Sequence, residues 1–98
     1  MTLQELTAKM SEGASKKTAF GNTVKFSTDE GNIYIDGMQS PPSVSNDDKG
    51  ADCTIKMSLG DLVDLVGGKL DGMSAFMTGK LKIEGDMGVA MKLQTILR

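Results

Sequence analysis

The residue types that carry out most enzyme chemistry are scarce in this chain. It contains no histidine, so the commonest general base and the commonest metal ligand are both missing. Its single cysteine, Cys53, has neither a histidine to activate it nor a second cysteine for a disulfide or a zinc cluster. Asp71 and Asp86 stand before predicted helices and fit N-caps better than acid–base residues. We therefore expect a non-enzymatic protein without cofactors.

The polar stretch 46–50 is the best candidate for a cation site. Asn46, Asp47 and Asp48 superficially suggest a calcium loop, but the spacing of ligands and glycine is wrong. Met57 stands where a closing glutamate would be needed. Gly79-Lys80 likewise lacks the upstream glycine and the following serine or threonine of a phosphate-binding loop. The sequence predicts neither a metal nor a nucleotide site.

Charge and hydropathy limit the partners. Lysine and arginine number 11 against 13 acids, a net charge of −2, and the two signs are interspersed. This pattern favours neither nucleic acid nor strong steering by an anionic membrane, although transient membrane contact is compatible with it. The N-terminus lacks the features of a signal peptide, and no apolar run approaches the ~18 residues of a membrane span. We expect one domain over residues 1–98, monomeric and cytoplasmic.

The hydrophobic pattern predicts a sequence of helices and strands. Alternating apolar and polar residues indicate strands, and an edge strand is left open at 42–45 because of the prolines. Apolar residues at helical spacing, bounded by capping residues, indicate helices. The expected strands are 19–29, 32–38, 52–57 and 80–84. The expected helices are 2–12 (ended by Gly13), 58–67, 71–79 and 86–97.

Strands of this kind make a sheet that is wet on one face and apolar on the other. The helices can bury their apolar stripes only on that one apolar face, which predicts a two-layer α+β sandwich. Tyr34 is expected on the wet face, and Cys53 as a small buried hydrophobic residue. The sheet's share of the core is predicted to be Val24, Phe26, Ile33, Ile35, Ile55, Met57, Leu81 and Ile83.

Methionine is unusually frequent, at eight of 98 residues, and it is concentrated near the C-terminal end. The methionines either pack an ordinary core that is poor in phenylalanine or form an adaptable wall around a changeable apolar guest. The last helix would have apolar residues on two faces, so that a protein partner, a dimer mate or an apolar cavity must cover one of them. The two faces are Met87, Ala90, Met91 and Gln94, and Val89, Leu93, Ile96 and Leu97.

The C-terminal half of the chain carries a series of motifs found together in one family. The segments are ADCTIKMS and LVGGKLDGMSAFMTGKLKIEGDMGVAMKLQ. In order and spacing they resemble the sterol carrier protein type two family, the non-specific lipid-transfer domain. The N-terminal half agrees with that family only in layout.

This resemblance implies a five-stranded, largely antiparallel sheet with helices on one face enclosing an apolar tunnel. It implies non-enzymatic binding and transfer of fatty acids, acyl-CoA esters, sterols or phospholipids, with docking on a protein partner as the alternative. Thr78 and Gln94 would be the polar residues nearest a ligand head group. The lining it implies is Ile35, Leu62, Val66, Phe76, Met77, Thr78, Ile83, Met87, Ala90, Met91 and Gln94.

The sequence departs from the family pattern at two places. Thr78 stands where family members commonly have glutamine, which affects the expected head-group preference. The chain also ends at Arg98 without the additional C-terminal segment and the Ser-Lys-Leu signal that many members carry. We therefore expect the cytoplasm rather than the peroxisome.

Overall fold

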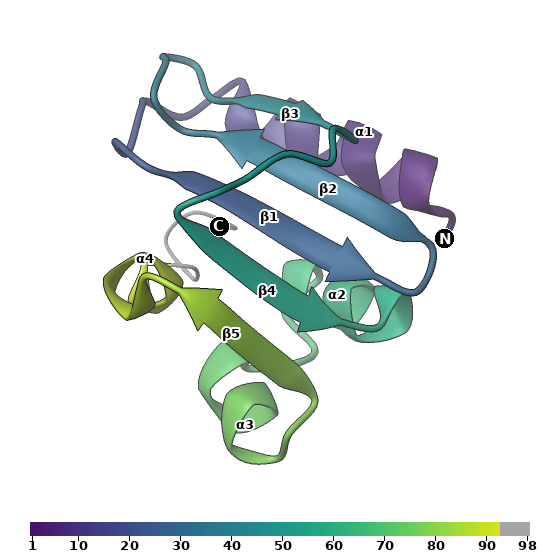
Figure 1. The fold of residues 1–98 in the computed structure, drawn as a ribbon. Helices are drawn as coiled ribbons and strands as arrows, with labels where there is room; N and C mark the ends of the chain where they lie inside the picture. Colours follow the sequence, from purple (N-terminus) through teal and green to yellow (C-terminus); the bar gives the residue numbers. More distant parts are fainter. Residues whose placement is uncertain (93–98) are drawn as a thin grey trace.

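A mixed sheet forms one layer, and helices cover one of its faces (Figure 1). The computed structural model describes residues 1–92. Within these residues no helix is long and apolar enough to cross a bilayer. The helices are α1 (Leu3–Ala14), α2 (Leu59–Val66), α3 (Gly72–Met77) and α4 (Met87–Met91). The strands are β1 (Thr23–Thr28), β2 (Gly31–Asp36), β3 (Ser43–Ser45), β4 (Cys53–Met57) and β5 (Leu81–Gly85).

The strand order is β3-β2-β1-β4-β5, with β1 and β4 parallel and the other pairs antiparallel. The register places Phe26 of β1 opposite both Ile33 of β2 and Ile55 of β4. Because side chains alternate along each strand, this alignment collects the apolar residues of every strand on one face, which we call the inner face. All eight sheet residues predicted for the core lie there, and the predicted α+β architecture is confirmed.

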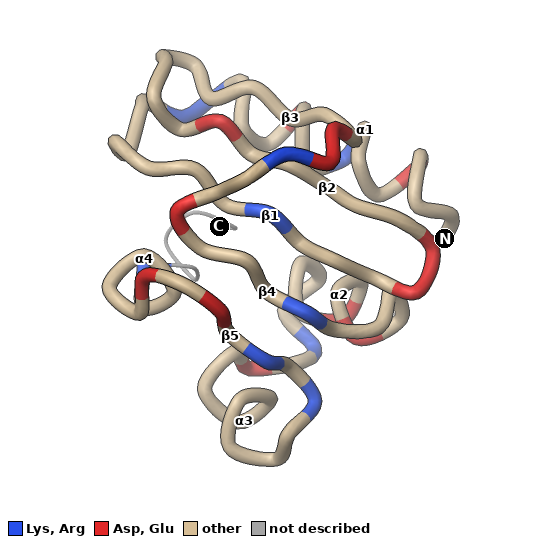
Figure 2. The backbone as a smooth tube through the Cα atoms, in the orientation of Figure 1, with Lys and Arg blue, Asp and Glu red and all other residues tan. Residues whose placement is uncertain are grey.

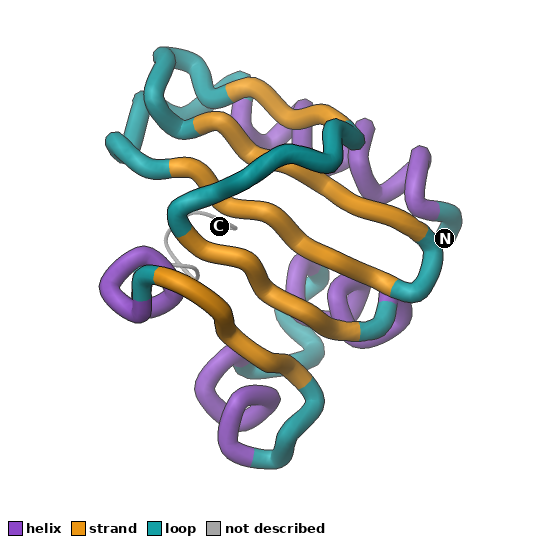
Figure 3. The backbone as a smooth tube through the Cα atoms, viewed as in Figure 1, coloured by secondary structure: helices purple, strands orange, loops and turns teal. Residues whose placement is uncertain are grey.

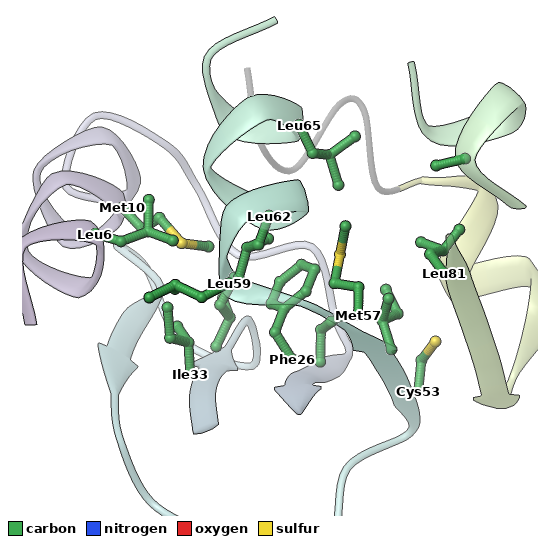
Figure 4. Packing of buried hydrophobic residues seen from close by; sticks show 14 of the residues in the cluster. Leu6, Met10, Phe26, Ile33, Cys53, Met57, Leu59, Leu62, Leu65 and Leu81 are labelled. Carbon is green, nitrogen blue, oxygen red and sulfur yellow. The ribbon is translucent and has the colours of Figure 1, made fainter. Parts of the chain in front are cut away.

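Helices α1 and α2 cover this inner face (Figure 4). Leu6 and Met10 of α1 and Leu62 and Leu65 of α2 are buried against it. Full burial of a leucine such as Leu62 contributes roughly 1.5–3 kcal/mol to folding. The hydrophobic layer between the sheet and these helices therefore holds the domain together.

Local capping fixes where the helices begin. Thr2 and Glu5 form the complete predicted capping box, with each side chain accepting the other residue's backbone N–H. At α2 the Ser58 hydroxyl accepts from the N–H of the third helical residue, as predicted. The Asp29 carboxylate, in the turn between β1 and β2, accepts the N–H of Leu59 at 2.8 Å. A turn distant in sequence thus anchors the start of α2.

The C-terminal ends of α1 and α4 differ from the predicted helix ends. The prediction that Gly13 ends α1 is wrong, because the helix continues to Ala14, which is buried, and ends at Ser15. Burial of Ala14 offsets part of the cost of about 1 kcal/mol for glycine inside a helix. The last helix is described only as Met87–Met91. Leu93, Gln94, Ile96 and Leu97 lie outside the described residues.

The sheet's other face, the outer face, is only partly wet. The connection from β3 to β4 crosses it, as Figures 1 and 3 show. Lys25 on that face pairs with Asp48 of the crossover at 3.0 Å, and Lys49 lies 5.0 Å from the centre of the Tyr34 ring. Tyr34 points outward as predicted, yet it is only 6% exposed. The expectation of a wholly wet face is wrong, because a parallel β1–β4 pair requires a crossover connection.

Asp52 anchors the end of this crossover to the start of β1. Its carboxylate accepts the backbone N–H of Thr23 at 3.0 Å and the side-chain amide of Asn22 at 3.3 Å. Its own backbone N–H donates to the Thr23 hydroxyl at 2.9 Å. These hydrogen bonds, led by the one from the Thr23 backbone, hold the pKa of Asp52 below its ordinary value of 3.8.

The Asp52 anchor predicts a specific acid sensitivity. A carboxylate with a lowered folded-state pKa contributes stability above its unfolded pKa, and this is lost as pH falls through the folded value. Below pH 3.8 the unfolding free energy of the wild type should therefore fall more steeply than that of Asp52→Asn. Chemical denaturation as a function of pH measures this difference, and carboxyl NMR titration measures the Asp52 pKa. If the unfolding free energies of the two proteins fall in parallel with pH, Asp52 does not stabilise the fold through these hydrogen bonds.

Candidate functional site

A cavity of about 190 Å³ lies between α1, the β2–β3 edge of the sheet and the end of α2. Its walls are mainly apolar, with lysines as their only charged members. Ile35 and Val66, both predicted from the sequence as lipid-lining residues, belong to it. The complete lining is Lys9, Met10, Gly13, Ala14, Lys17, Phe20, Ile35, Pro42, Val44 and Val66.

Helix α1 forms one wall of the cavity, because its lining residues recur at intervals of four. Lys9, Gly13 and Lys17 follow each other four residues apart, and Met10 and Ala14 repeat the same interval one residue later. In a helix this spacing stacks side chains on one side, and Lys17 continues the line past the helix end. A Cβ added at Gly13 would meet nothing within 4 Å, so this position leaves open space beside the cavity. The small residues provide the room, and the lysines flank it.

Phe20 forms another wall because of the backbone beneath it. The N–H groups of Phe20 and Gly21 both donate to the carbonyl of Gly37 at 2.9 Å. The Phe20 ring lies directly over Gly37, where an added Cβ would overlap the ring's outer atoms. Gly37 is buried and does not have a positive φ. Its lack of a side chain is needed to seat the ring rather than to permit an unusual backbone conformation.

The lysines give the cavity its electrostatic character. Lys9 is exposed, whereas Lys17 is half-buried. Burial lowers the pKa of Lys17, because desolvation disfavours the ammonium. An ammonium group beside apolar walls suits a ligand with an anionic head and a hydrocarbon body. The long lysine stems can lie along the apolar wall while their charged ends stay near water.

The volume limits how much ligand this cavity holds. An apolar cavity of about 150 Å³ can accept a benzene ring. The cavity of about 190 Å³ therefore has room for a short length of hydrocarbon but not for a whole long-chain lipid. Met10 in its wall is flexible and can adopt other rotamers at low cost. A longer chain would have to widen the space beside α2.

The remaining predicted lining residues are placed elsewhere. Leu62 is fully buried in the core, one helical turn before Val66, and Ile83 and Ala90 are partly buried against it. Thr78 is exposed, and its hydroxyl donates to the carbonyl of Ser74 at 2.8 Å. Gln94 lies outside the described residues. Of these residues, the described ones do not line the cavity, and contact of the whole set with lipid stays a prediction.

The exposed members of the predicted lining are the large apolar residues of α3 and α4. Phe76 and Met77 of α3, and Met87 and Met91 of α4, are all exposed. Each helix instead buries one smaller residue against the core, Ala75 in α3 and Val89 in α4. The structure therefore separates the predicted lining into a part in or near the cavity beside α1 and α2 and an exposed part on α3 and α4.

The residues considered for catalysis have structural positions. Cys53 is fully buried in the core, and burial, with a smaller effect of Asp86, raises the pKa of its thiol. Asp71 and Asp86 cap α3 and α4 by accepting backbone N–H groups. Among the described residues no group of three His, Cys, Asp or Glu side chains could hold a metal ion. The described part of the chain offers no activated nucleophile.

Sequence reasoning missed the other residues of the cavity as lining residues: Lys9, Met10, Gly13, Ala14, Lys17, Phe20, Pro42 and Val44. The repeat of lysine, glycine and lysine at intervals of four was a usable signal on α1. No comparable signal marks Phe20 or Pro42, because each reaches the cavity through loop conformation and sheet pairing.

Comparison with known sequences identifies related proteins. The SCP-2 sterol transfer family matches residues 3–98. Sterol carrier protein 2 of Gallus gallus is 57% identical over 68 residues, which are 68% of this chain and 12% of that protein. Hydroxysteroid dehydrogenase-like protein 2 of Xenopus laevis is 34% identical over 99 residues, covering 98% of this chain and 24% of that protein. The chain thus spans a small part of each relative.

Solved structures share the fold. The sterol carrier protein domain 2 of Helicoverpa armigera has a TM-score of 0.79 and 28% identity, covering 96% of this chain and 84% of that one. Sterol Carrier Protein-2 of Aedes aegypti, solved with the C16 fatty acid palmitate, has a TM-score of 0.78 and 18% identity. That match covers 99% of this chain and 96% of the other.

The seat of the Phe20 ring gives a testable prediction. Gly37→Ala should displace the ring and lower the unfolding free energy by about 1–3 kcal/mol, as overpacking usually does. In a double-mutant cycle with Phe20→Ala, the alanine at position 37 should cost much less, because the overlapping ring is gone. Denaturant unfolding of the four proteins in the cycle measures the coupling. Additive effects would show that the ring does not depend on Gly37.

Proposed function

Because the chain belongs to the SCP-2 sterol transfer family, we propose that it binds single lipid molecules and carries them between membranes without changing them chemically. The observation that carries this proposal is the apolar cavity flanked by lysines. Apolar walls exclude water, and burial of each ligand methylene contributes about 0.8 kcal/mol. Binding of this kind needs few directional contacts, which suits a carrier of varied lipids.

The lysines favour a fatty acid or another acyl lipid with an anionic head group. The head would lie near Lys9 and Lys17, and the hydrocarbon would enter past Ile35 and Val66. The related fold of the Aedes aegypti protein, which was solved with palmitate, supports this ligand class. A charge-assisted hydrogen bond to a partly exposed lysine contributes about 1 kcal/mol, less than burial of a few methylenes. The head group would therefore set orientation more than affinity.

Helix α2 offers a route for a longer chain. Val66 lies in the cavity wall, and Leu62 and Leu65 continue from it into the core (Figure 4). Met10 and Met57 flank this layer and are flexible enough to move aside. The hydrocarbon would extend along this line towards α3, where the family resemblance places Phe76 and Met77. Such a path would join the predicted lining residues near the cavity to the exposed ones on α3.

A catalytic function has little support in these residues. The sequence has no histidine to activate a hydroxyl or thiol, and its only thiol is buried with a raised pKa. The larger relatives, including the hydroxysteroid dehydrogenase-like protein, extend well beyond the matched part.

Filling the cavity should prevent binding. Val66→Phe places a ring where the ligand chain would enter and should weaken binding of a fluorescent fatty acid by about tenfold or more. Val63→Phe is the matched control, because Val63 lies on the same helix, is partly buried and does not line the cavity. Fluorescence titration gives the affinities, and denaturant unfolding verifies that both variants fold. Equal affinity in the two variants would place the ligand elsewhere.

The head-group contact should depend on Lys17 and on pH. Lys17→Gln should weaken fatty-acid binding by about fivefold, whereas Lys16→Gln, on an exposed neighbour, should have little effect. The Lys17 ammonium is lost as pH rises through its pKa, which lies below the ordinary lysine value of 10.5. Wild-type affinity for the fatty acid should therefore decline at alkaline pH, as the pH rises through the lowered pKa of Lys17. The decline should be smaller in Lys17→Gln, which has no ammonium group to lose. Titrations across alkaline pH would contradict the contact if both lysine variants follow the wild type.

A further inference from the structure

The two edge strands of the sheet are protected to different degrees. At one edge, β3 has only three residues, follows Pro41 and Pro42, and contacts α1. Short strands, prolines and covering elements are means by which proteins prevent an edge from pairing with another chain. At the other edge, β5 has five residues and no proline. Among residues 1–92 no strand pairs with the outer side of β5.

The backbone of β5 directs polar groups to this outer side. The Asp86 N–H donates to the Asp52 carbonyl at 2.9 Å, which fixes the alternation of hydrogen bonds between β4 and β5. By that alternation, every second residue of β5 directs its N–H and C=O away from β4, namely Leu81, Ile83 and Gly85. Helices α3 and α4 lie at the two ends of the strand (Figure 1). The outer side of β5 can therefore accept another strand.

The charges along β5 have opposite signs in its two halves. Lys80 and Lys82 come first, and Glu84 and Asp86 follow at the same interval of two residues. Figure 2 shows the lysines at one end of the strand and the acids at the other. Lysines on an edge strand usually oppose pairing, because they would meet other lysines. Here an antiparallel copy of the same strand would present acids to the lysines instead.

We infer that β5 pairs with β5 of a second copy of this chain, antiparallel and with the two-fold axis at Ile83. Leu81 then lies opposite Gly85 of the second copy, and Ile83 lies opposite its own equivalent. Because these are the residues with outward backbone groups, each such position is a hydrogen-bonded pair, and about six backbone hydrogen bonds join the two sheets. The contact is closed, since both copies use the same strand.

Charge selects this register over its neighbours. A two-fold axis at Lys82 would place that lysine opposite its own equivalent, and an axis at Glu84 would do the same with two glutamates. Like charges directly opposite each other destabilise a strand pair. With the axis at Ile83, Lys82 lies opposite Glu84 of the second copy, and Lys80 lies opposite Asp86 of the second copy. Each of these contacts occurs twice because of the symmetry.

Lys82 lacks a counter-charge within one copy of the described chain. In the register of β4 and β5 it lies directly opposite Lys56, a like charge. Lys56 pairs with Glu84 at 3.1 Å, whereas Lys82 forms no ion pair among residues 1–92. Glu84 of a second copy would lie on the other side of Lys82 and supply the opposite charge. This complementarity favours a second copy over an unrelated strand.

The pairing leaves the cavity free and should be weak. The cavity lies at the opposite edge of the sheet, by β2 and β3, so that each copy could bind its own ligand. One strand pair is much smaller than a stable protein interface. We therefore expect a reversible dimer in place of the strict monomer that the sequence predicts.

Self-association and amide exchange test the pairing directly. Between roughly 20 µM and 1 mM protein, sedimentation equilibrium should show an average mass that rises with concentration. Over the same range the amide exchange of Ile83 should slow by about twofold or more, whereas that of Lys82 and Glu84, already bonded to β4, should change less. A constant monomer mass, or a rising mass without protection of Ile83, would overturn the inference.

Charge reversal tests the register. Lys82→Glu and Glu84→Lys each place like charges opposite one another and should each weaken self-association by about tenfold. A mixture of the two variants should associate again, because each position then faces the opposite charge. Denaturant unfolding verifies that both variants fold, which is expected because both side chains are exposed.

Two variants control for net charge. Lys16→Glu and Glu30→Lys change the net charge by the same amounts at exposed positions outside β5, and they should associate as the wild type does. Equal weakening in Lys82→Glu and Lys16→Glu would overturn the inference. A mixture of Lys82→Glu and Glu84→Lys that stays monomeric would overturn it as well.

Discussion

The parallel alignment of β4 beside β1 is the constraint on which the rest of the structure depends. It brings Cys53 and Ile55 into line with Val24 and Phe26, so that the two halves of the chain share one apolar face. It also requires the chain to cross the sheet between β3 and β4, and the outer face carries that crossing (Figure 3). The inner face is thereby left entirely to the helices. Asp52, the Lys25–Asp48 pair and Lys49 over Tyr34 hold the crossing in place.

This arrangement produces an apolar cavity at one edge of the sheet and a group of exposed apolar side chains at the other. At the β3 edge, α1 packs along β3 and β2, and its small residues and lysines border the cavity. At the β5 edge, α3 and α4 are too short to span the sheet and turn their large side chains outward. A cavity can enclose hydrocarbon, whereas exposed apolar side chains on separate helices do not enclose anything by themselves.

Much of the architecture was predictable because its signals are local. Alternation in β1, β2, β4 and β5 identified the strands, and Thr2, Ser58, Asp71 and Asp86 marked the helix starts. Burial of Ala14 was not a local signal, so the predicted end of α1 at Gly13 was wrong. The site was less predictable. Ile35 and Val66 of the predicted lining do line the cavity, but Phe20 and Pro42 reach it from loops that only tertiary contacts position.

The sequence by itself determined which residues are apolar on each strand and helix, the absence of histidine, and the family through its C-terminal motifs. These follow from residue identity and short-range spacing. Tertiary structure alone decided that β4 pairs with β1, that Tyr34 is covered, and that Met77 and Met91 face outward while Ala75 and Val89 face inward. Helical periodicity shows which side chains share a face. Which face is buried depends on the surface that the remainder of the chain presents to it.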